Sequence, residues 1–145
     1  AIKENGGVVF VNFYPGYIDS AYEEKAKVVK ESFKLKSDSL AKLYDPNSDN
    51  YWYKESEMLV PHLQSVVPDL GDVVDHIEYI IDLIGIDHVG IGADWDGVEI
   101  LPRGIDKISK LPDLTKALLK RGYSERDVKK ILGGNFKRVF KEVTS

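Results

Sequence analysis

The sequence predicts an α/β fold built around a parallel sheet. The apolar run at residues 8–14 is rich in β-branched and aromatic residues and suits a strand that is covered on both faces, and residues 87–94 are predicted to form a second strand. Segments with helical periodicity lie between these strands and after them. This order of strand, helices and strand implies parallel strands joined by a helical crossover. No internal repeat, low-complexity tract or linker divides the chain, so residues 1–145 are predicted to form a single region.

The composition limits the partners that the chain can bind. Its 145 residues are 43% hydrophobic and 30% charged, which is typical of one globular domain. The net charge of −4 argues against nucleic acid as the main partner, because phosphate binding needs a basic patch. The absence of cysteine excludes disulfides and thiolate metal sites. No apolar run is long enough for a membrane segment. With no cysteine and no visible signal peptide, a cytoplasmic location is favoured.

The first strand lies between two breaks in the pattern. The opening "AIKENGG" is typical of the last turn of a helix capped by Gly6 and Gly7. It lacks an initiator methionine, so we expect part of the natural protein to lie upstream. The strand follows at 8–14, and the segment "PGYIDS", which begins at Pro15, ends it.

The segment after the first strand is predicted to be partly helical. A charged helix is expected over 21–43, with apolar positions that include Val28, Phe33 and Leu40. Residues 45–70 contain several prolines and are expected to be irregular, with a short helix near 55–66. The aromatic cluster at 51–53 is expected to pack on this loop rather than line a pocket.

The remaining elements follow from periodicity and capping signals. An amphipathic helix is predicted over 71–85, where Gly85 ends it. The second strand and a loop at 97–110 come next. Three helices follow at 112–122, 124–134 and 135–143; Ser124 is the expected N-cap of the second, with Asp127 three residues on.

A sheet of only two strands would have two bare edges and too little surface to cover its own helices. We therefore expect the missing strands to come from an upstream part of a longer chain, from a nicked partner or from a second copy.

The candidate site is the acidic stretch "ADWDG" after the second strand. In parallel α/β folds the chemistry gathers at the carboxyl ends of strands, and Asp94 stands where the strand ends. A carboxylate there could orient a metal-bound water, accept its proton or hold a substrate ammonium. Capping of the following turn is an equal alternative for Asp94. It is the favoured role for Asp96, which precedes Gly97.

Asn12 and Tyr14 are the other candidates, as substrate contacts. Both stand near the carboxyl end of the first strand, and strand alternation would point them the same way. For Tyr14, simple packing at the rim is an equal alternative. The three histidines, His62, His76 and His88, are expected to be structural, because no two have the spacing of a metal-binding pair.

Three stretches resemble the renal or membrane dipeptidase family of zinc peptidases: "ENGGVVFVNFYPGYI", "DVVDHIEYIIDLIGIDHVGIGADWDGV" and "PDLTKALLKRGYSERDVKKILGGNFKRVFKEV". The resemblance implies a (β/α)8 TIM-type barrel of the metal-dependent hydrolase kind, of which this chain would be the C-terminal part, with strands seven and eight. It also implies hydrolysis of dipeptides by a water that two zinc ions activate. The family's zinc ligands lie on earlier strands and none of their motifs occurs here, so no metal ligand is assigned.

The resemblance also suggests roles for single residues. Asp94 matches the active-site acid of the last strand, which is associated with proton transfer and the substrate's amino end. Tyr14 matches an aromatic position near the substrate, and Trp95 stands where phenylalanine is more usual. Without the metal ligands, the chain alone is expected not to hydrolyse peptides. Its expected partners are a dipeptide substrate and either the upstream part of the barrel or further copies of itself.

Three alternatives remain from the sequence. The "DWDG" motif is similar to the nucleophile motif of haloacid-dehalogenase phosphatases, which would use Asp94 and Asp96 with magnesium, although Val98 replaces the usual hydroxyl residue. A calcium-binding loop is weaker, because Arg103 stands where an EF-hand needs glutamate. The chain could also be a non-catalytic fragment or scaffold that folds by pairing with another copy.

Overall fold

Two parallel strands form the centre of the fold, which the computed structural model describes for residues 1–145. β1 (Val9–Asn12) pairs in parallel with β2 (Val89–Ala93). A register shift near the end of β1 places Asn12 opposite Ala93. Both predicted strands are confirmed. Each is shorter than predicted: β1 ends at Asn12, and β2 begins at Val89 because Asp87 and His88 belong to a 3-10 turn.

The crossover between the strands ends in an amphipathic helix, α5 (Leu70–Ile84). Asp69 and Asp72 form a reciprocal capping box at its N-terminus, which satisfies backbone N–H groups that have no partner inside the helix. Gly85 ends it with a φ of 91°, a conformation that glycine adopts without strain. A short 3-10 turn (Ile86–His88) then leads into β2. The predicted helix is thus confirmed almost to the residue.

The chain after the second strand runs through a loop and a series of helices. They are a 3-10 turn (Ile108–Lys110), α6 (Leu111–Lys120), α7 (Glu125–Lys129), a π turn (Lys130–Gly134) and α8 (Asn135–Thr144). The predicted N-cap is confirmed, since Ser124 Oγ accepts a hydrogen bond of 3.2 Å from the backbone N–H of Asp127. The π turn joins the last two predicted helices, and Gly133 at a φ of 150° makes the kink between them.

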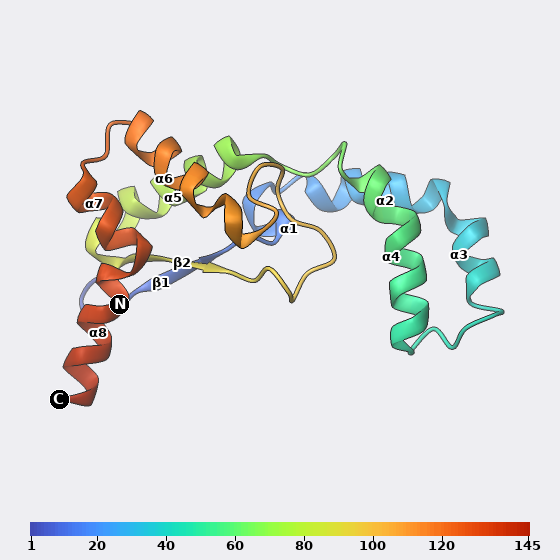
Figure 1. The fold of residues 1–145 in the computed structure, drawn as a ribbon, viewed down its shortest axis with the longest axis horizontal. Coiled ribbons are helices and arrows are strands. Elements are labelled where there is room, and N and C mark those ends of the chain that lie inside the picture. Colours follow the sequence, from blue (N-terminus) through green and yellow to red (C-terminus); the bar gives the residue numbers. More distant parts are fainter.

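One face of the sheet carries the main hydrophobic core. The helices α5 and α6 lie on one side of the two strands (Figure 1). The buried side chains come from both strands and from α5, α6, α7 and the π turn; among them are Val11, Phe13, Val73, Ile77, Val89, Leu114, Leu118 and Ile131. Asn135 is the one buried polar residue. It donates hydrogen bonds to the carbonyls of Ile86 and Val89, at 2.7 and 2.8 Å.

The opposite face of the sheet is open, which corrects the expectation that both faces are covered. Phe10 on that face remains 45% exposed, and Phe136 of α8 packs edge-on against it at 5.9 Å between ring centroids. The neighbouring positions on β2 are Gly90 and Gly92, which have no side chain to cover the face. Both edges of the sheet are also bare, because only two strands are present.

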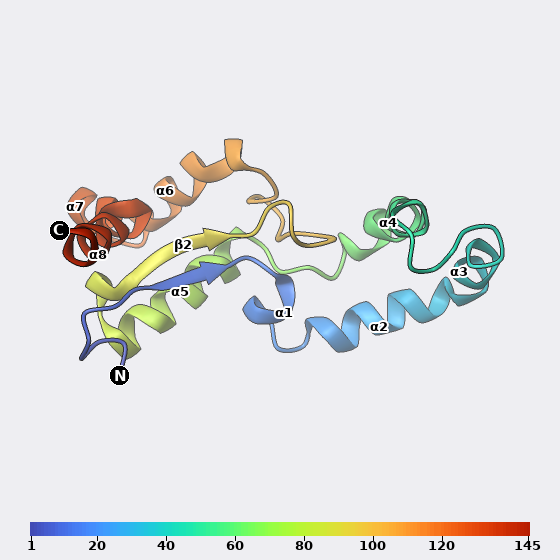
Figure 2. The same ribbon diagram turned by 90° about the horizontal axis from the view of Figure 1, so that it is seen from below.

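Between β1 and α5 the chain forms a helical arm that extends away from the core (Figures 1 and 2). A single turn, α1 (Pro15–Ile18), precedes the arm, which consists of α2 (Tyr22–Ser32), α3 (Lys34–Leu40) and α4 (Asp49–Leu63). A second apolar cluster packs the arm against the segment after α4 and the loop after β2; it consists of Tyr22, Ala26, Leu59, Leu63, Val67 and Ile100. Figure 2 shows that both strands point towards the arm. No helix of the chain has the length and apolar character needed to cross a bilayer.

The arm differs from the sequence prediction in two places. The helix expected over 21–43 is broken at Phe33, whose φ and ψ of −104° and 2° are not helical. The ring of Phe33 packs against His62 of α4 at 4.3 Å between centroids, so a contact with a distant helix accompanies the break.

The segment expected to be irregular contains the second difference, because α4 begins at Asp49. Ser48 caps this helix by accepting a hydrogen bond of 3.2 Å from the backbone N–H of Tyr51, and Pro61 is tolerated inside its last turn. The aromatic cluster therefore lies on a helix instead of a loop. Trp52 and Tyr53 pack on each other at 5.0 Å between centroids.

Candidate active site

Two of the predicted site residues meet where the strands end. Asn12 is the last residue of β1, and Asp94 follows β2 directly. The Nδ2 amide of Asn12 donates a hydrogen bond of 2.9 Å to Asp94 Oδ2. The structure therefore brings these two side chains together at one end of the sheet, as the parallel arrangement predicts.

The orientation of the Asn12 amide is fixed by a second hydrogen bond. The backbone N–H of Tyr14 donates to Asn12 Oδ1 at 2.7 Å. Since the amide oxygen has this partner, the NH2 group is left to face the carboxylate. A donor held in this way keeps the Asp94 carboxylate in one position.

The backbone at the end of β2 adopts an unusual conformation. Ala93 and Asp94 are the only residues other than glycine with positive φ, at 57° and 74°. The N–H of Asp94 donates to the carbonyl of Gly92 at 2.9 Å, which closes a three-residue turn. Such residues cost about 1–3 kcal/mol each and concentrate at functional sites. The strain directs the Asp94 side chain out of the strand and towards Asn12.

A glycine makes room for the Asp94 carboxylate. A Cβ atom on Gly97 would lie only 2.0 Å from Asp94 Oδ1, so a side chain at position 97 would displace the carboxylate or the turn. Asp96 lies in the turn between Asp94 and Gly97; like Asp94 it is exposed, but it makes no side-chain hydrogen bond. The second aspartate is therefore a turn residue in this structure, whereas the first has a fixed polar partner.

Trp95 anchors the loop that follows. Its indole N–H donates to the carbonyl of Ile105 at 3.0 Å, and its ring packs edge-on against the buried ring of Phe13 at 5.9 Å. The aromatic residue at this position thus ties the strained turn to the main core.

Tyr14 occupies a different part of the rim from Asp94. It follows β1 and precedes α1, so strand alternation no longer governs its direction. Its hydroxyl donates a hydrogen bond of 2.6 Å to Glu23 Oε1 on α2. This bond, together with burial and the negative charge of Glu23, raises the pKa of Tyr14 to about 12. Tyr14 is thus directed at the arm and not at the Asn12–Asp94 pair.

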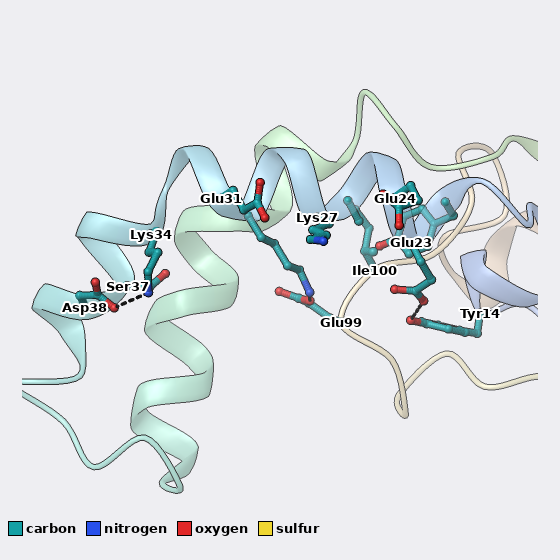
Figure 3. Close-up of a pocket in the computed structure, with 13 residues that line it drawn as sticks. Tyr14, Glu23, Glu24, Lys27, Glu31, Lys34, Ser37, Asp38, Glu99 and Ile100 are labelled. Carbon is teal, nitrogen blue, oxygen red and sulfur yellow. Dashed lines mark hydrogen bonds and ion pairs between the residues drawn. The ribbon is translucent and has the colours of Figure 1, made fainter.

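A groove of about 540 Å³ begins at Tyr14 and runs along α2 (Figure 3). We call it the α2 groove. Its lining includes Tyr14, Tyr22, Glu23, Lys30, Glu99 and Ile100. Lys30 and Glu99 form an ion pair of 3.3 Å between the arm and the loop after β2. The sequence gives no sign of this groove, because alternating charges on α2 are typical of a helix face in water.

The histidines have structural environments. His88 Nδ1 lies 2.8 Å from the carbonyl oxygen of Gly7, and His62 packs on Phe33. Burial lowers the pKa of His76 within α5. No three His, Asp or Glu side chains of the chain are arranged to hold a metal ion, so the residues present do not by themselves form a zinc site.

These features define an α/β protein with a candidate active site at the carboxyl ends of parallel strands. The sequence model of the membrane dipeptidase family, peptidase family M19, matches residues 1–145. The chain belongs to this family.

Curated relatives and one solved structure agree with this assignment. The chain is 49% identical over 74 residues to dipeptidase aclJ of Aspergillus oryzae, 52% over 71 residues to dipeptidase ataJ of Aspergillus terreus and 46% over 76 residues to dipeptidase verJ of Clonostachys rogersoniana. These matches cover 51%, 49% and 52% of this chain but only 18%, 17% and 20% of the relatives.

The structural match is longer. The crystal structure of the probable dipeptidase PvdM from Pseudomonas aeruginosa matches 94% of this chain, with a TM-score of 0.62 and 29% sequence identity. The match covers 37% of that chain. The chain thus spans well under half the length of the relatives described here.

Proposed function

We propose that this chain supplies part of the active site of an enzyme that hydrolyses dipeptides, with Asp94 as the active-site carboxylate. The observation that carries the proposal is the fixed position of Asp94, whose carboxylate is held by Asn12 at the carboxyl end of β2. The positive φ of Asp94 and the space left by Gly97 support it, because both serve to place this one side chain. Membership of the dipeptidase family favours this function over the phosphatase and calcium-binding alternatives.

The chemistry that Asp94 can perform follows from the reaction. Hydrolysis of a peptide bond consumes a water, whose proton must be removed, and releases an amine, which must gain a proton. A carboxylate near the scissile bond can accept the first proton and return it to the leaving nitrogen. The same carboxylate can instead pair with the free ammonium of a dipeptide. In both roles Asn12 orients the carboxylate by donating to Oδ2 and leaves Oδ1 for the substrate or water.

We further propose that β1 and β2 are the seventh and eighth strands of a (β/α)8 barrel. The open sheet face around Phe10 and the two bare edges are the surfaces that neighbouring strands and interior side chains of a barrel would cover. The similarity to PvdM over 94% of the present chain supports this placement.

The zinc ions expected from the family resemblance need ligands that residues 1–145 do not supply together. We propose that these ligands lie outside the present residues, and we assign no step of the reaction to them. The 145 residues alone are then expected to show no dipeptidase activity.

The test compares two aspartates of the same loop. Native mass spectrometry first identifies a purified assembly that contains this chain together with the upstream part of the barrel, and release of free amino acids from dipeptides by that active assembly is then measured. Asp94→Asn should lower the rate about 100-fold or more, the range for loss of a general acid–base. Asp96→Asn serves as the matched control and should change it less than about three-fold. Equal rates for the two variants would refute the role of Asp94.

A further inference from the structure

We propose that the α2 groove is a subsite for a positively charged side chain, an ammonium or a guanidinium, of the substrate. The proposal rests on the proposed function, because it places one side chain of a dipeptide in this groove. It assigns a binding role to residues of the arm, which lie apart from the Asn12–Asp94 pair.

The groove begins close to the candidate active site. Tyr14 lines its inner end, and the backbone N–H of the same residue holds the amide of Asn12 at 2.7 Å. Asn12 in turn contacts Asp94 at 2.9 Å. The loop after β2 contributes the opposite wall with Glu99 (Figure 3). A substrate bound at Asp94 can therefore extend a side chain from the strand ends into the groove.

The charges that line the groove favour a cation. Its carboxylates, on Glu23, Glu24, Glu31, Asp38 and Glu99, outnumber its lysines five to three. Two lysines are already paired, Lys30 with Glu99 at 3.3 Å and Lys34 with Asp38 at 3.4 Å. By contrast, Glu23, Glu24 and Glu31 have no lysine or arginine partner in the chain. A groove of one prevailing sign attracts ligands of the opposite sign.

A tyrosine hydroxyl in the lining makes no hydrogen bond within the chain. Tyr22 is only 3% exposed and lines the groove, yet its hydroxyl makes no hydrogen bond within the chain. Burial, followed by the effects of Tyr14, Glu99 and Glu23, raises the pKa of Tyr22, so this hydroxyl stays neutral and retains its lone pairs. An ammonium or guanidinium N–H in the groove can donate a hydrogen bond to this oxygen.

The aromatic rings add a second attraction for a cation. Tyr14 and Tyr22 both line the groove, and their rings pack edge-on at 6.1 Å between centroids. Ring faces attract cations within about 6 Å. The inner end of the groove thus combines carboxylates, ring surfaces and an unused acceptor, which together match a basic side chain better than an acidic or apolar one.

The first part of the test uses three probes of similar size on the intact protein. They are n-butylammonium, n-pentanoate and n-butanol, and binding is followed by NMR through the ring signals of Tyr14 and Tyr22. Butylammonium is expected to bind at least about five-fold more tightly than the other two, and its affinity should fall as salt screens the carboxylates. Tighter binding of pentanoate, or equal binding of all three, would overturn the proposal.

Variants then locate the site. Glu23→Gln should weaken butylammonium binding about five-fold, the upper range for a single exposed charge pair. Tyr22→Phe should also weaken it without lowering the unfolding temperature, since the hydroxyl has no partner to lose. Glu57→Gln and Tyr51→Phe, on α4 and outside the groove, are the matched controls and should leave the affinity unchanged. If the controls weaken binding as much as the groove variants do, the groove is not the site.

The two proposals can fail separately. Asp94→Asn should lower the rate of hydrolysis about 100-fold or more and leave butylammonium binding intact. Loss of hydrolysis in this variant without any cation binding by the native protein would refute the subsite alone. Cation binding together with unchanged hydrolysis would refute the role of Asp94 alone.

Discussion

Asn12 and Asp94 are 82 positions apart in the chain, and a hydrogen bond of 2.9 Å joins their side chains at the carboxyl ends of β1 and β2. The register shift that places Asn12 opposite Ala93 allows this contact. The pairing of the two strands therefore brings the Asp94 carboxylate within hydrogen-bond distance of the Asn12 amide.

The first prediction concerns Asn12. Asn12→Ala removes the donor to Asp94 Oδ2, so the carboxylate should sample several orientations. We expect kcat for dipeptide hydrolysis to fall about ten-fold with little change in KM, because the substrate contacts remain. Steady-state kinetics of the assembled enzyme provide the measurement. If KM rises and kcat is unchanged, Asn12 binds substrate directly instead of positioning Asp94.

The second prediction concerns Gly97. Gly97→Ala would bring a Cβ atom to within 2.0 Å of Asp94 Oδ1 and must displace the carboxylate or the turn. We expect a loss of activity close to that of Asp94→Asn. In a double-mutant cycle, the combined variant should be no less active than Asp94→Asn alone, since both changes act on the same group. Additive losses would show that Gly97 serves another purpose.

A third prediction follows from the high pKa of Tyr14. The hydrogen bond to Glu23 raises this pKa to about 12 in the folded chain, whereas an unfolded tyrosine titrates near about 10. The neutral hydroxyl therefore stabilises the fold fully below about pH 10, and this contribution is lost as the pH rises towards 12. The absorbance of tyrosinate and the unfolding midpoint can be followed over this interval.

Tyr14→Phe should remove the tyrosinate absorbance step near pH 12. In this variant the unfolding midpoint should fall less steeply as the pH rises above about 10. Tyr17→Phe, on the exposed neighbour in α1, is the control and should retain both. An unchanged absorbance step in Tyr14→Phe would contradict the assignment.

The fourth prediction concerns the buried Asn135. Its amide donates to the carbonyls of Ile86 and Val89, and it joins the start of α8 to the start of β2. Asn135→Ala leaves both carbonyls without this donor, so we expect the free energy of unfolding to fall by about 2–4 kcal/mol. Denaturant unfolding measures the loss. Asn47→Ala, in the exposed loop before α4, should cost less than about 0.5 kcal/mol.

The sequence predicts those parts of the fold that local patterns determine. Both strands, α5 and the C-terminal helices follow from apolar runs, helical periodicity and caps such as Ser124. The break at Phe33 was not predicted, because it coincides with a contact to His62 on another helix. The early start of α4 was missed although Ser48 is a regular N-cap, since the prolines of the segment suggested an irregular loop.

In the candidate site, too, some features follow from local sequence patterns and others depend on contacts between distant residues. Asp94 and Asn12 were predicted to share one rim because parallel strands end on the same side. The bond between them depends on the register shift and on two positive φ angles, which no local pattern reveals. The α2 groove was not predicted at all, because Glu23 and Lys30 look like ordinary surface charges until α2 is placed beside the loop after β2.

The helical arm leaves and rejoins the core at neighbouring points, because α1 before it contacts α5 after it. A segment whose two ends lie so close can be lengthened, shortened or exchanged at little entropic cost, because the cost of closing a loop rises only with the logarithm of its length. Under the proposed function and subsite, related proteins can alter this one segment, and with it the side chain that the groove would accept, while Asp94 keeps its place at the end of β2. The two proposed roles, side-chain selection by the arm and proton transfer by Asp94, would then lie on parts of the chain that can change independently in evolution.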